Sequence, residues 1–453
     1  MDNKLIVRMY NVGLGDCIHL QVPDKDHTYH ILIDCGNKYG DVADLQKAIS
    51  LLEEALDPID PDQPDGKKWL DLLVVTHRHE DHIKGFDPEW FENIKIGRIW
   101  LSASIDLNHP QVEAKKSFRV QEFAMDTLTS LSALGLGGQL GDLVDDLLSL
   151  NNAGALQALR KTLPENSEIE PLYVHAGTPQ EELIEFDDPA IMLHVLAPMK
   201  DIDHYYLGRI ADDLLGFQEH SKEVKALAAK PADGAESAGH ANQPKNISQS
   251  DFRNLRKNMH NTALSFVLKA GHLVNNTSTV LLLEWHGRRL LFSGDAQFKP
   301  SHKGQFRAGT SNGSWNVMWS IPEIQAKLGQ PLDFIKVGHH GSHNATPWVK
   351  PEPGKKEHPI NEIFNAMLPK PQENAKPKAR AIVSTMRTSS YEKIPDKELM
   401  EEMGQRVANV NRYDEPAVKG YKIDAGVDQP LRTDQEKTKN GERVPYLEVV
   451  FEP

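Results

Sequence analysis

Residues 76 to 82 read THRHEDH, which places three histidines and two carboxylates in seven positions directly after the apolar run LDLLVV at 70 to 75. A core histidine needs only one or two hydrogen-bond partners, and an exposed histidine needs none, so neither use explains this density. If the preceding strand ends at Thr76, His77 and His79 lie on an extended segment, where residues i and i+2 point the same way. The stretch therefore predicts a site with several metal ligands.

The same seven residues offer two neighbouring positions for metal. His77 and His79 would hold one ion, while Asp81 and His82, at the turn into a following helix, would face a second position beside it. Imidazole combined with carboxylate suits Zn, Mn or Fe. The alternative is a solvated loop, for which this composition is rare.

Other apolar strands also end in residues that bind metals. Asp295 follows RLLFSG, His339 and His340 follow FIKVG, and Asp34 follows ILI. Taken singly, Asp295 is also typical of a turn or helix cap, Asp34 of a turn, and HHGSH of a surface loop. Together with THRHEDH they favour one metal site assembled at the ends of several strands.

Alternating apolar runs and turn residues predict an α/β chain with sheets inside and helices outside, forming one domain over 1–453. A helix is expected at 41–56, a helical insertion at 105–190 and a low-complexity mobile loop at 219–250. The expected strands are 4–10, 17–22, 29–34, 70–75, 97–103, 190–198, 264–270, 278–285, 288–294, 334–338, 381–384 and 446–451.

The charge balance argues against a polyanion-binding surface. Lys and Arg number 51 against 65 Asp and Glu, a net charge of -14, so the mean field repels nucleic acid and any phosphate must be held by local positive charge. The basic clusters KKSFR at 115–119 and RNLRK at 253–257 lack interleaved aromatic residues and are interpreted as solvated helix faces. We expect no strong basic nucleic-acid surface.

Cysteine content and hydropathy indicate the compartment. Cys17 and Cys35 are too few for a disulfide framework and are predicted to be buried free thiols. No leader-type start and no run near the ~20 apolar residues of a membrane span occur. A cytoplasmic protein without membrane contact is expected.

The order of the motifs resembles the metallo-β-lactamase superfamily of hydrolases, with an aspartate closing an early strand, then HxHxDH, a strand-ending GD and a late strand-ending histidine. The wording of five segments resembles in particular the metallo-hydrolase domain of ComEC-type competence proteins and their standalone relatives. These segments are NVGLGDCIHL at 11–20, ILIDCG at 31–36, THRHEDHIKG at 76–85, LLFSGDA at 290–296 and KVGHHGS at 336–342. The resemblance runs from residue 11 to about residue 346 and implies a four-layer αββα sandwich with a helical insertion.

The resemblance implies a binuclear centre that holds two divalent ions, Zn or Mn. His77 and His79 would bind the first ion, and Asp81 and His82 the second. Asp295 would bridge both. Asp81 is expected to be a catalytic residue as well as a metal ligand.

The late motif and the early aspartate complete the implied site. His339 is expected to be the last ligand of the second ion because it directly follows the strand-ending glycine. His340 or His343 would then be placed to protonate a leaving oxygen. Asp34 would orient the ligands.

One position departs from the superfamily pattern. Where the superfamily usually has a further metal-binding histidine, about twenty residues before the GD aspartate, this chain has VNNTSTVLLLEW. Asn275 lies closest to that place and is the expected ligand, with His272 and His260 as nearby alternatives. Asparagine is a weak ligand, so water would complete the shell of the first ion.

Two metals ~3.5 to 4 Å apart share a water and lower its pKa towards ~7, which supplies hydroxide at neutral pH. The expected function is therefore a metal-dependent hydrolase that uses a metal-bound hydroxide. The motif wording favours a phosphodiesterase or nuclease acting on DNA, RNA or a nucleotide. The alternatives are a hydrolase of a carboxylic ester, amide or thioester, and a non-catalytic binding or scaffold module on the same fold.

Overall fold

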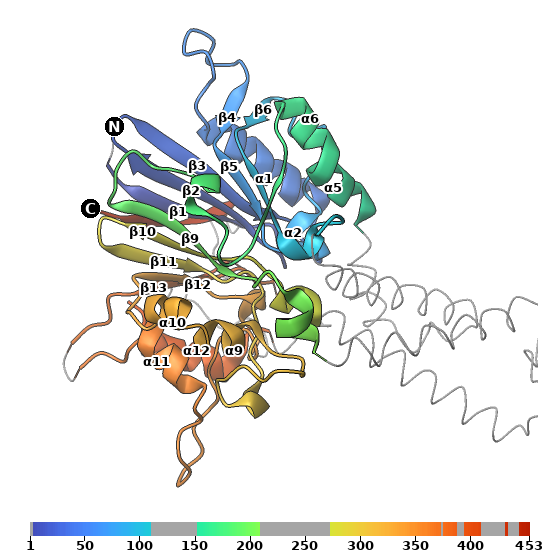
Figure 1. Cartoon of the computed structure of the whole chain (residues 1–453). Coiled ribbons are helices and arrows are strands. Elements are labelled where there is room, and N and C mark those ends of the chain that lie inside the picture. Colours follow the sequence, from blue (N-terminus) through green and yellow to red (C-terminus); the bar gives the residue numbers. More distant parts are fainter. Residues whose placement is uncertain are drawn as a thin grey trace, which may run out of the picture.

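The computed structural model describes residues 3–109, 152–208, 272–372, 375–386, 394–408, 431–433 and 444–453. The strand expected at 264–270, the loop expected at 219–250 and a large part of the insertion expected at 105–190 lie outside these ranges. Figure 1 shows the arrangement of the described elements.

The N-terminal half of the chain forms most of a seven-stranded sheet in the order β15-β1-β2-β3-β5-β7-β8. The strands on the β1 side pair antiparallel, and β3, β5, β7 and β8 pair parallel. The parallel strands therefore bring their carboxyl ends to one edge. The strands are β1 (Leu5–Tyr10), β2 (Cys17–Asp24), β3 (His27–Cys35), β5 (Leu72–Val75), β7 (Ile99–Ser102), β8 (Leu172–Val174) and β15 (Tyr446–Phe451).

A six-stranded sheet in the order β14-β13-β12-β11-β10-β9 contains the second set of motif strands. Its strands from β11 to β14 are parallel, while β9, β10 and β11 pair antiparallel. These strands are β9 (Ile191–Ala197), β10 (Val280–Trp285), β11 (Arg288–Phe292), β12 (Phe334–Lys336), β13 (Arg380–Val383) and β14 (Leu431–Arg432). A small pair is formed by β4 (Lys68–Leu70) and β6 (Ile94–Ile96).

Helices lie beside both sheets in Figure 1. On the side of the seven-stranded sheet are α1 (Val42–Ala55), α2 (Glu80–Ile83), α5 (Ala153–Gln157) and α6 (Leu163–Ser167). On the side of the six-stranded sheet are α9 (Ser314–Trp319), α10 (Pro322–Leu328), α11 (Asn361–Met367) and α12 (Lys397–Gly404). Short helical segments are η1 (Ala103–Ile105), η3 (Ala158–Thr162), η4 (Gln180–Glu182), η5 (Asp203–Leu207), η6 (Pro300–His302) and η7 (His339–Gly341).

Strand alternation divides the core into layers. Trp100 of the first sheet and Trp285 of the second are completely buried in one cluster that joins the two sheets. Alternate residues of the same strands face away from this shared core. Leu73 of β5 packs with α1, and Ile335 of β12 packs with α11 and α12. Because each sheet is buried on both faces, its strands are nearly continuous apolar runs.

The α/β class and most of the expected strands agree with this structure, with ends that differ by a few residues. The run at 70–75 is divided between two strands, since Leu70 ends β4 and Leu72 begins β5. Between them, the buried carboxylate of Asp71 accepts the backbone N–H of His30 and the indole N–H of Trp69. Cys17 and Cys35 are buried free thiols, as predicted. Within the described ranges, no helix has the length and apolar character needed to cross a membrane.

The expected insertion at 105–190 needs a correction in its described part. Helical turns cover 153–167, but β8 is a strand that pairs in parallel with β7 at the edge of the seven-stranded sheet. With only three residues, β8 is too short to show an alternating pattern in the sequence. The helical stretch therefore ends before β8.

Candidate metal centre

Four of the five motif segments meet where the two sheets adjoin. Asp34 lies at the end of β3 and THRHEDH follows β5, its parallel neighbour. Asp295 follows β11, and His339 and His340 follow β12, again a parallel neighbour. Residues separated by more than 200 positions are thereby brought within contact distance.

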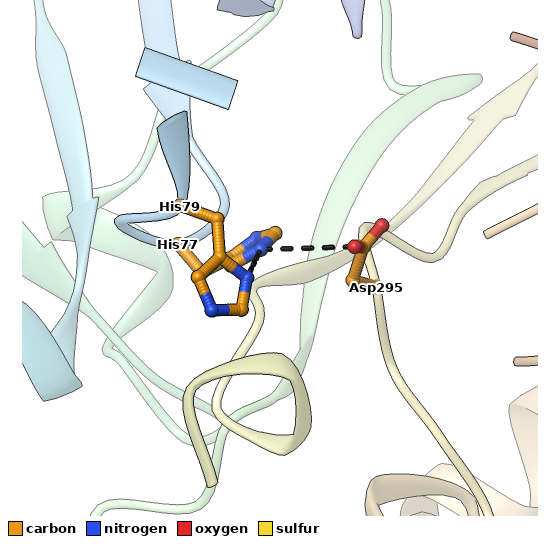
Figure 2. A group of neighbouring side chains, drawn as sticks. All are labelled: His77, His79 and Asp295. Atoms are coloured by element: carbon orange, nitrogen blue, oxygen red, sulfur yellow. Dashed lines mark hydrogen bonds and ion pairs between the residues drawn. The ribbon is translucent and has the colours of Figure 1, made fainter. Parts of the chain in front are cut away.

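One group of converging side chains contains His77, His79 and Asp295. Nε2 of His77 lies 2.9 Å from Nδ1 of His79 and 3.8 Å from Oδ2 of Asp295. Figure 2 shows the two rings together on one loop, with Asp295 facing them from the end of β11. The ring of His77 is completely buried, and so is the carboxylate of Asp295.

A second group contains Asp81, His82 and His340. Nε2 of His340 lies 2.9 Å from Oδ2 of Asp81. Nε2 of His82 lies 3.4 Å from Oδ2 of Asp295, so Asp295 is adjacent to both groups. The structure therefore has two neighbouring sets of metal-ligand side chains with one shared carboxylate.

Asp34 fixes the orientation of His82. Its carboxylate accepts the backbone N–H of Thr76 at 2.7 Å and the hydroxyl of Thr76 at 2.6 Å, and it lies 2.8 Å from Nδ1 of His82. Because Asp34 accepts the Nδ1 proton, Nε2 of His82 faces Asp295, where it can bind a metal ion once it is deprotonated. The Thr76 oxygen is also 3.0 Å from Nδ1 of His77, which orients that ring in the same manner.

The two histidines of the first group are neutral at pH 7. Burial lowers the pKa of His77 well below its usual value, and the neighbouring imidazoles of His82 and His79 lower it further. Burial also lowers the pKa of His79 to about 4, against the opposing effect of Asp81 and Asp295. Neutral imidazole is the form that binds a metal ion.

His82 lies in the opposite electrostatic environment. Burial disfavours its charged form, but the carboxylates of Asp295, Asp34 and Asp81 outweigh burial and raise the pKa of His82 well above its usual value. Burial would raise the pKa of Asp81, but His82 and His340 hold it well below its usual value. The carboxylates thus favour positive charge at this place, which a metal ion would also supply.

Two buried atoms test whether a metal fits. Nε2 of His82 and Oδ2 of Asp295 have no hydrogen-bond partner among the described residues, although both are buried and 3.4 Å apart. An unsatisfied buried polar atom costs about 1–3 kcal/mol, and more when it is charged. A divalent ion between the two groups would satisfy both atoms, so the side chains fit a metal.

The structure separates the two histidines of the late motif. His340 is buried, and its Nδ1 lies 3.0 Å from the carbonyl of Ser384, which leaves Nε2 towards Asp81. The side chain of His339, expected to be the ligand, is 28% exposed and its Nε2 lies 4.0 Å from Oδ2 of Asp295. Both residues have a positive φ, 44° and 54°, a backbone conformation that is rare outside glycine and is typical of strained functional sites.

A polar chain that the sequence did not indicate orients His339. Nε2 of Gln297 lies 3.5 Å from Nδ1 of His339, and its Oε1 lies 2.7 Å from Nδ1 of His272. Since the amide nitrogen can only donate, Nδ1 of His339 is the acceptor and Nε2 carries the proton. His339 therefore presents an N–H beside Asp295.

The remaining expected residues have different positions. Asn275 is buried and its Oδ1 has no hydrogen-bond partner among the described residues. The segment from 272 to 278 contacts the site because the hydroxyl of Ser278 accepts the backbone N–H of Asp295. His343 is exposed, and His260 lies outside the described residues.

Gly36 allows the THRHEDH loop to approach the end of β3. A Cβ at Gly36 would lie 2.4 Å from the carbonyl oxygen of Glu80 and 2.5 Å from the backbone nitrogen of His82. We expect Gly36→Ala to push α2 away from Asp34, lower the free energy of unfolding by about 1–3 kcal/mol and reduce bound metal. Urea unfolding and elemental analysis measure the two effects.

Gly154 in α5 is the matched control, because a Cβ there would meet no atom within 4 Å. Alanine at this helical position is expected to leave metal content unchanged and to raise the free energy of unfolding by about 0.5–1 kcal/mol. An unchanged unfolding midpoint in Gly36→Ala would contradict the close approach.

Three further residues surround the ligands without having been expected there: Asp16 before β2, Lys336 at the end of β12 and Ser384 after β13. All three are buried, and Asp16 accepts from the other two. A lysine inside the apolar run FIKV was the one local signal in the sequence.

The fold and site therefore define a mixed α/β protein with a buried cluster of histidines and carboxylates at the meeting edge of two sheets. No family model matches the sequence, and no curated protein does. Among solved structures, the chain is similar to the metallo-beta-lactamase fold protein YhfI from Bacillus subtilis, at 8% identity and a TM-score of 0.26. The match covers 73% of this chain and 70% of that one.

Proposed function

We propose that the protein is a binuclear metal-dependent hydrolase that cleaves phosphodiesters, on a four-layer αββα arrangement of the metallo-β-lactamase type. The observation that carries the proposal is a pair of buried atoms without a hydrogen-bond partner, His82 Nε2 and Asp295 Oδ2, which lie 3.4 Å apart as an ion pair between two groups of ligand side chains. A scaffold module would have no need for this costly arrangement.

The proposed ligands follow from the two groups. His77 and His79 hold one ion, with Asn275 as a further candidate. Asp295 lies next to both positions, as a shared ligand must.

At the second position, Asp81 and His82 are joined by His340, which replaces His339 in our assignment because His340 is the buried neighbour of Asp81. Bound ions, Zn or Mn, would lower the pKa of water and polarise the substrate oxygen. Asp34 orients His82 by accepting its Nδ1 proton.

His339 is the proposed proton donor to the leaving oxygen. Gln297 orients the ring, and the partial exposure of His339 places its Nε2–H where a substrate oxygen can reach it. The acid is the imidazolium form, which becomes neutral imidazole when it gives up the proton, and burial lowers the pKa of this group. A general acid in this position contributes typically about 10²–10⁴-fold to the rate. The chain itself thus provides both ligands and an acid.

The choice of a phosphodiester rests on the resemblance of the motif wording to ComEC-type proteins. The metals would supply the positive charge that the net charge of -14 does not provide. The same site geometry also suits a carboxylic ester, amide or thioester, so substrate class is decided by a substrate panel.

The test uses purified protein, treated with a chelator and reloaded with Zn or Mn, on an aryl phosphodiester, DNA, a nucleotide and an aryl ester. We expect phosphodiester cleavage that disappears with the chelator and returns with metal. His79→Ala is expected to remove cleavage, while His358→Ala, at a half-buried histidine outside both ligand groups, retains it. Cleavage that survives His79→Ala would refute the assigned site, and ester cleavage alone would reassign the substrate.

A further inference from the structure

A buried cation that is not a proposed ligand lies beside the metal centre. Lys336 ends β12, is completely buried, and its Nζ donates to Oδ2 of Asp16, which precedes β2 in the other sheet. Phe334, two residues earlier on the same strand, faces the core between the sheets. Burying two charges costs several kcal/mol per ion before their attraction is counted, so this pair needs a reason.

Asp16 is connected to two of the proposed ligands. Its backbone N–H donates to the carbonyl of Asp81 at 2.9 Å. Its Oδ1 accepts the hydroxyl of Ser384, whose carbonyl oxygen lies 3.0 Å from Nδ1 of His340. Since a carbonyl oxygen only accepts, Nδ1 of His340 is the donor, and Nε2 remains available to bind a metal ion. Asp16 therefore helps to fix both Asp81 and His340.

The third ligand of the same position is also near Asp16. Oδ2 of Asp16 lies 3.7 Å from Nδ1 of His82, while Asp34 accepts that proton at 2.8 Å. Asp16, Asp34 and His82 are close enough together to hold a cation of their own. The ammonium of Lys336 supplies this positive charge at Asp16. Asp34 is then the carboxylate that accepts the Nδ1 proton of His82.

The charge state of Lys336 agrees with this role. Burial lowers the pKa of its ammonium, but Asp16 and Asp295 outweigh burial and raise the pKa above its usual value. The group is therefore a permanent cation in the buried space between the sheets.

We propose that Lys336 and Asp16 are positioning residues of the second metal position, with Lys336 a fixed cation that holds Asp16 and thereby keeps Asp81, His82 and His340 in place to bind metal. This inference rests on the proposed metal centre. Partners of this kind, which act on a ligand through hydrogen bonds, typically change metal affinity by about 10–100-fold.

The experiment measures metal directly, by elemental analysis after dialysis and by competition with a chelator. Lys336→Met keeps an unbranched side chain as far as the ε position and removes the charged ammonium. We expect it to reduce the metal content from two ions towards one per chain and to weaken binding of the more labile ion about 10–100-fold. Combining it with Asp16→Asn is expected to recover part of the loss, because no unpaired carboxylate remains.

Phe334→Leu is the matched control, since it disturbs the same face of the same strand without contacting the ligands. It is expected to lower the unfolding temperature and leave both ions bound. If Lys336→Met does not fold, Ser384→Ala, which removes the hydroxyl donor but retains the carbonyl, must weaken the same ion.

Three outcomes are decisive against the inference. If Lys336→Met binds both ions with wild-type affinity, the inference is overturned and the proposed function stands. If Lys336→Met is unfolded, the same result in Ser384→Ala has the same meaning. An equal loss of metal in Phe334→Leu reduces the pair to a structural role and overturns it too. Wild-type protein that binds no metal overturns the proposed function together with it.

Discussion

Asp295→Asn is expected to abolish detectable phosphodiester cleavage, with a loss on the order of 10³-fold or more. Oδ2 of Asp295 lies 3.8 Å from His77 and 3.4 Å from His82, so one substitution affects both proposed metal positions. The amide retains the shape and removes the negative charge. A metal contributes several kcal/mol to the stabilisation of transition-state charge, and each 1.36 kcal/mol is a factor of ten in rate.

The measurement combines initial rates on an aryl phosphodiester with metal content. Both ions are expected to be bound more weakly in Asp295→Asn. The matched control is Asp333→Asn, which removes a carboxylate that pairs with the partly exposed Arg288 away from the site. This partly exposed pair is worth about 0–1 kcal/mol, and the Asn oxygen can still accept the backbone N–H of Arg289, so rate and metal content should remain unchanged. Full activity in Asp295→Asn would show that the site has been assigned to the wrong carboxylate.

The general position of the site could be predicted because its signals are local. Apolar runs mark buried strands, and Asp34, THRHEDH and Asp295 each follow such a run directly. Asp34 and THRHEDH follow neighbouring parallel strands, whose ends share an edge once the strands pair. Asp295 follows a strand of the other sheet, so it reaches them through the packing of the two sheets. Each of these signals is therefore visible in a few consecutive residues.

The residues that surround the ligands could not be predicted in the same manner. Lys336 and Asp16 are 320 positions apart and belong to different sheets, so no spacing connects them. Gln297 orients His339 from a loop whose sequence has no distinctive pattern. Such contacts depend on how two sheets are packed, which hydrophobic periodicity does not specify.

Sequence position alone does not decide between His339 and His340, and the reason is conformational. Position directly after the strand-ending glycine favoured His339. In the structure both residues are left-handed, at φ 44° and 54°, followed by Gly341 at 81°. Consecutive left-handed residues turn the chain so that the second ring enters the site.

His340→Ala and His339→Ala are therefore expected to differ in their metal content. Because His340 is buried against Asp81, its removal should release one ion and reduce cleavage on the order of 10³-fold. His339→Ala should retain both ions and reduce cleavage by about 10²–10⁴-fold, the usual contribution of a general acid. Metal content thus separates two variants whose rates alone would look similar.

A substrate with a better leaving group gives the second distinction. If His339 protonates the leaving oxygen, an aryl phosphodiester with an acidic phenol needs little protonation, so His339→Ala should lose far less activity on it than on DNA. His340→Ala should lose activity on both substrates, since a missing ligand affects the reaction whatever group departs. His339→Ala with an ion missing, and His340→Ala with both retained, would restore His339 as the ligand and leave His340 as the acid.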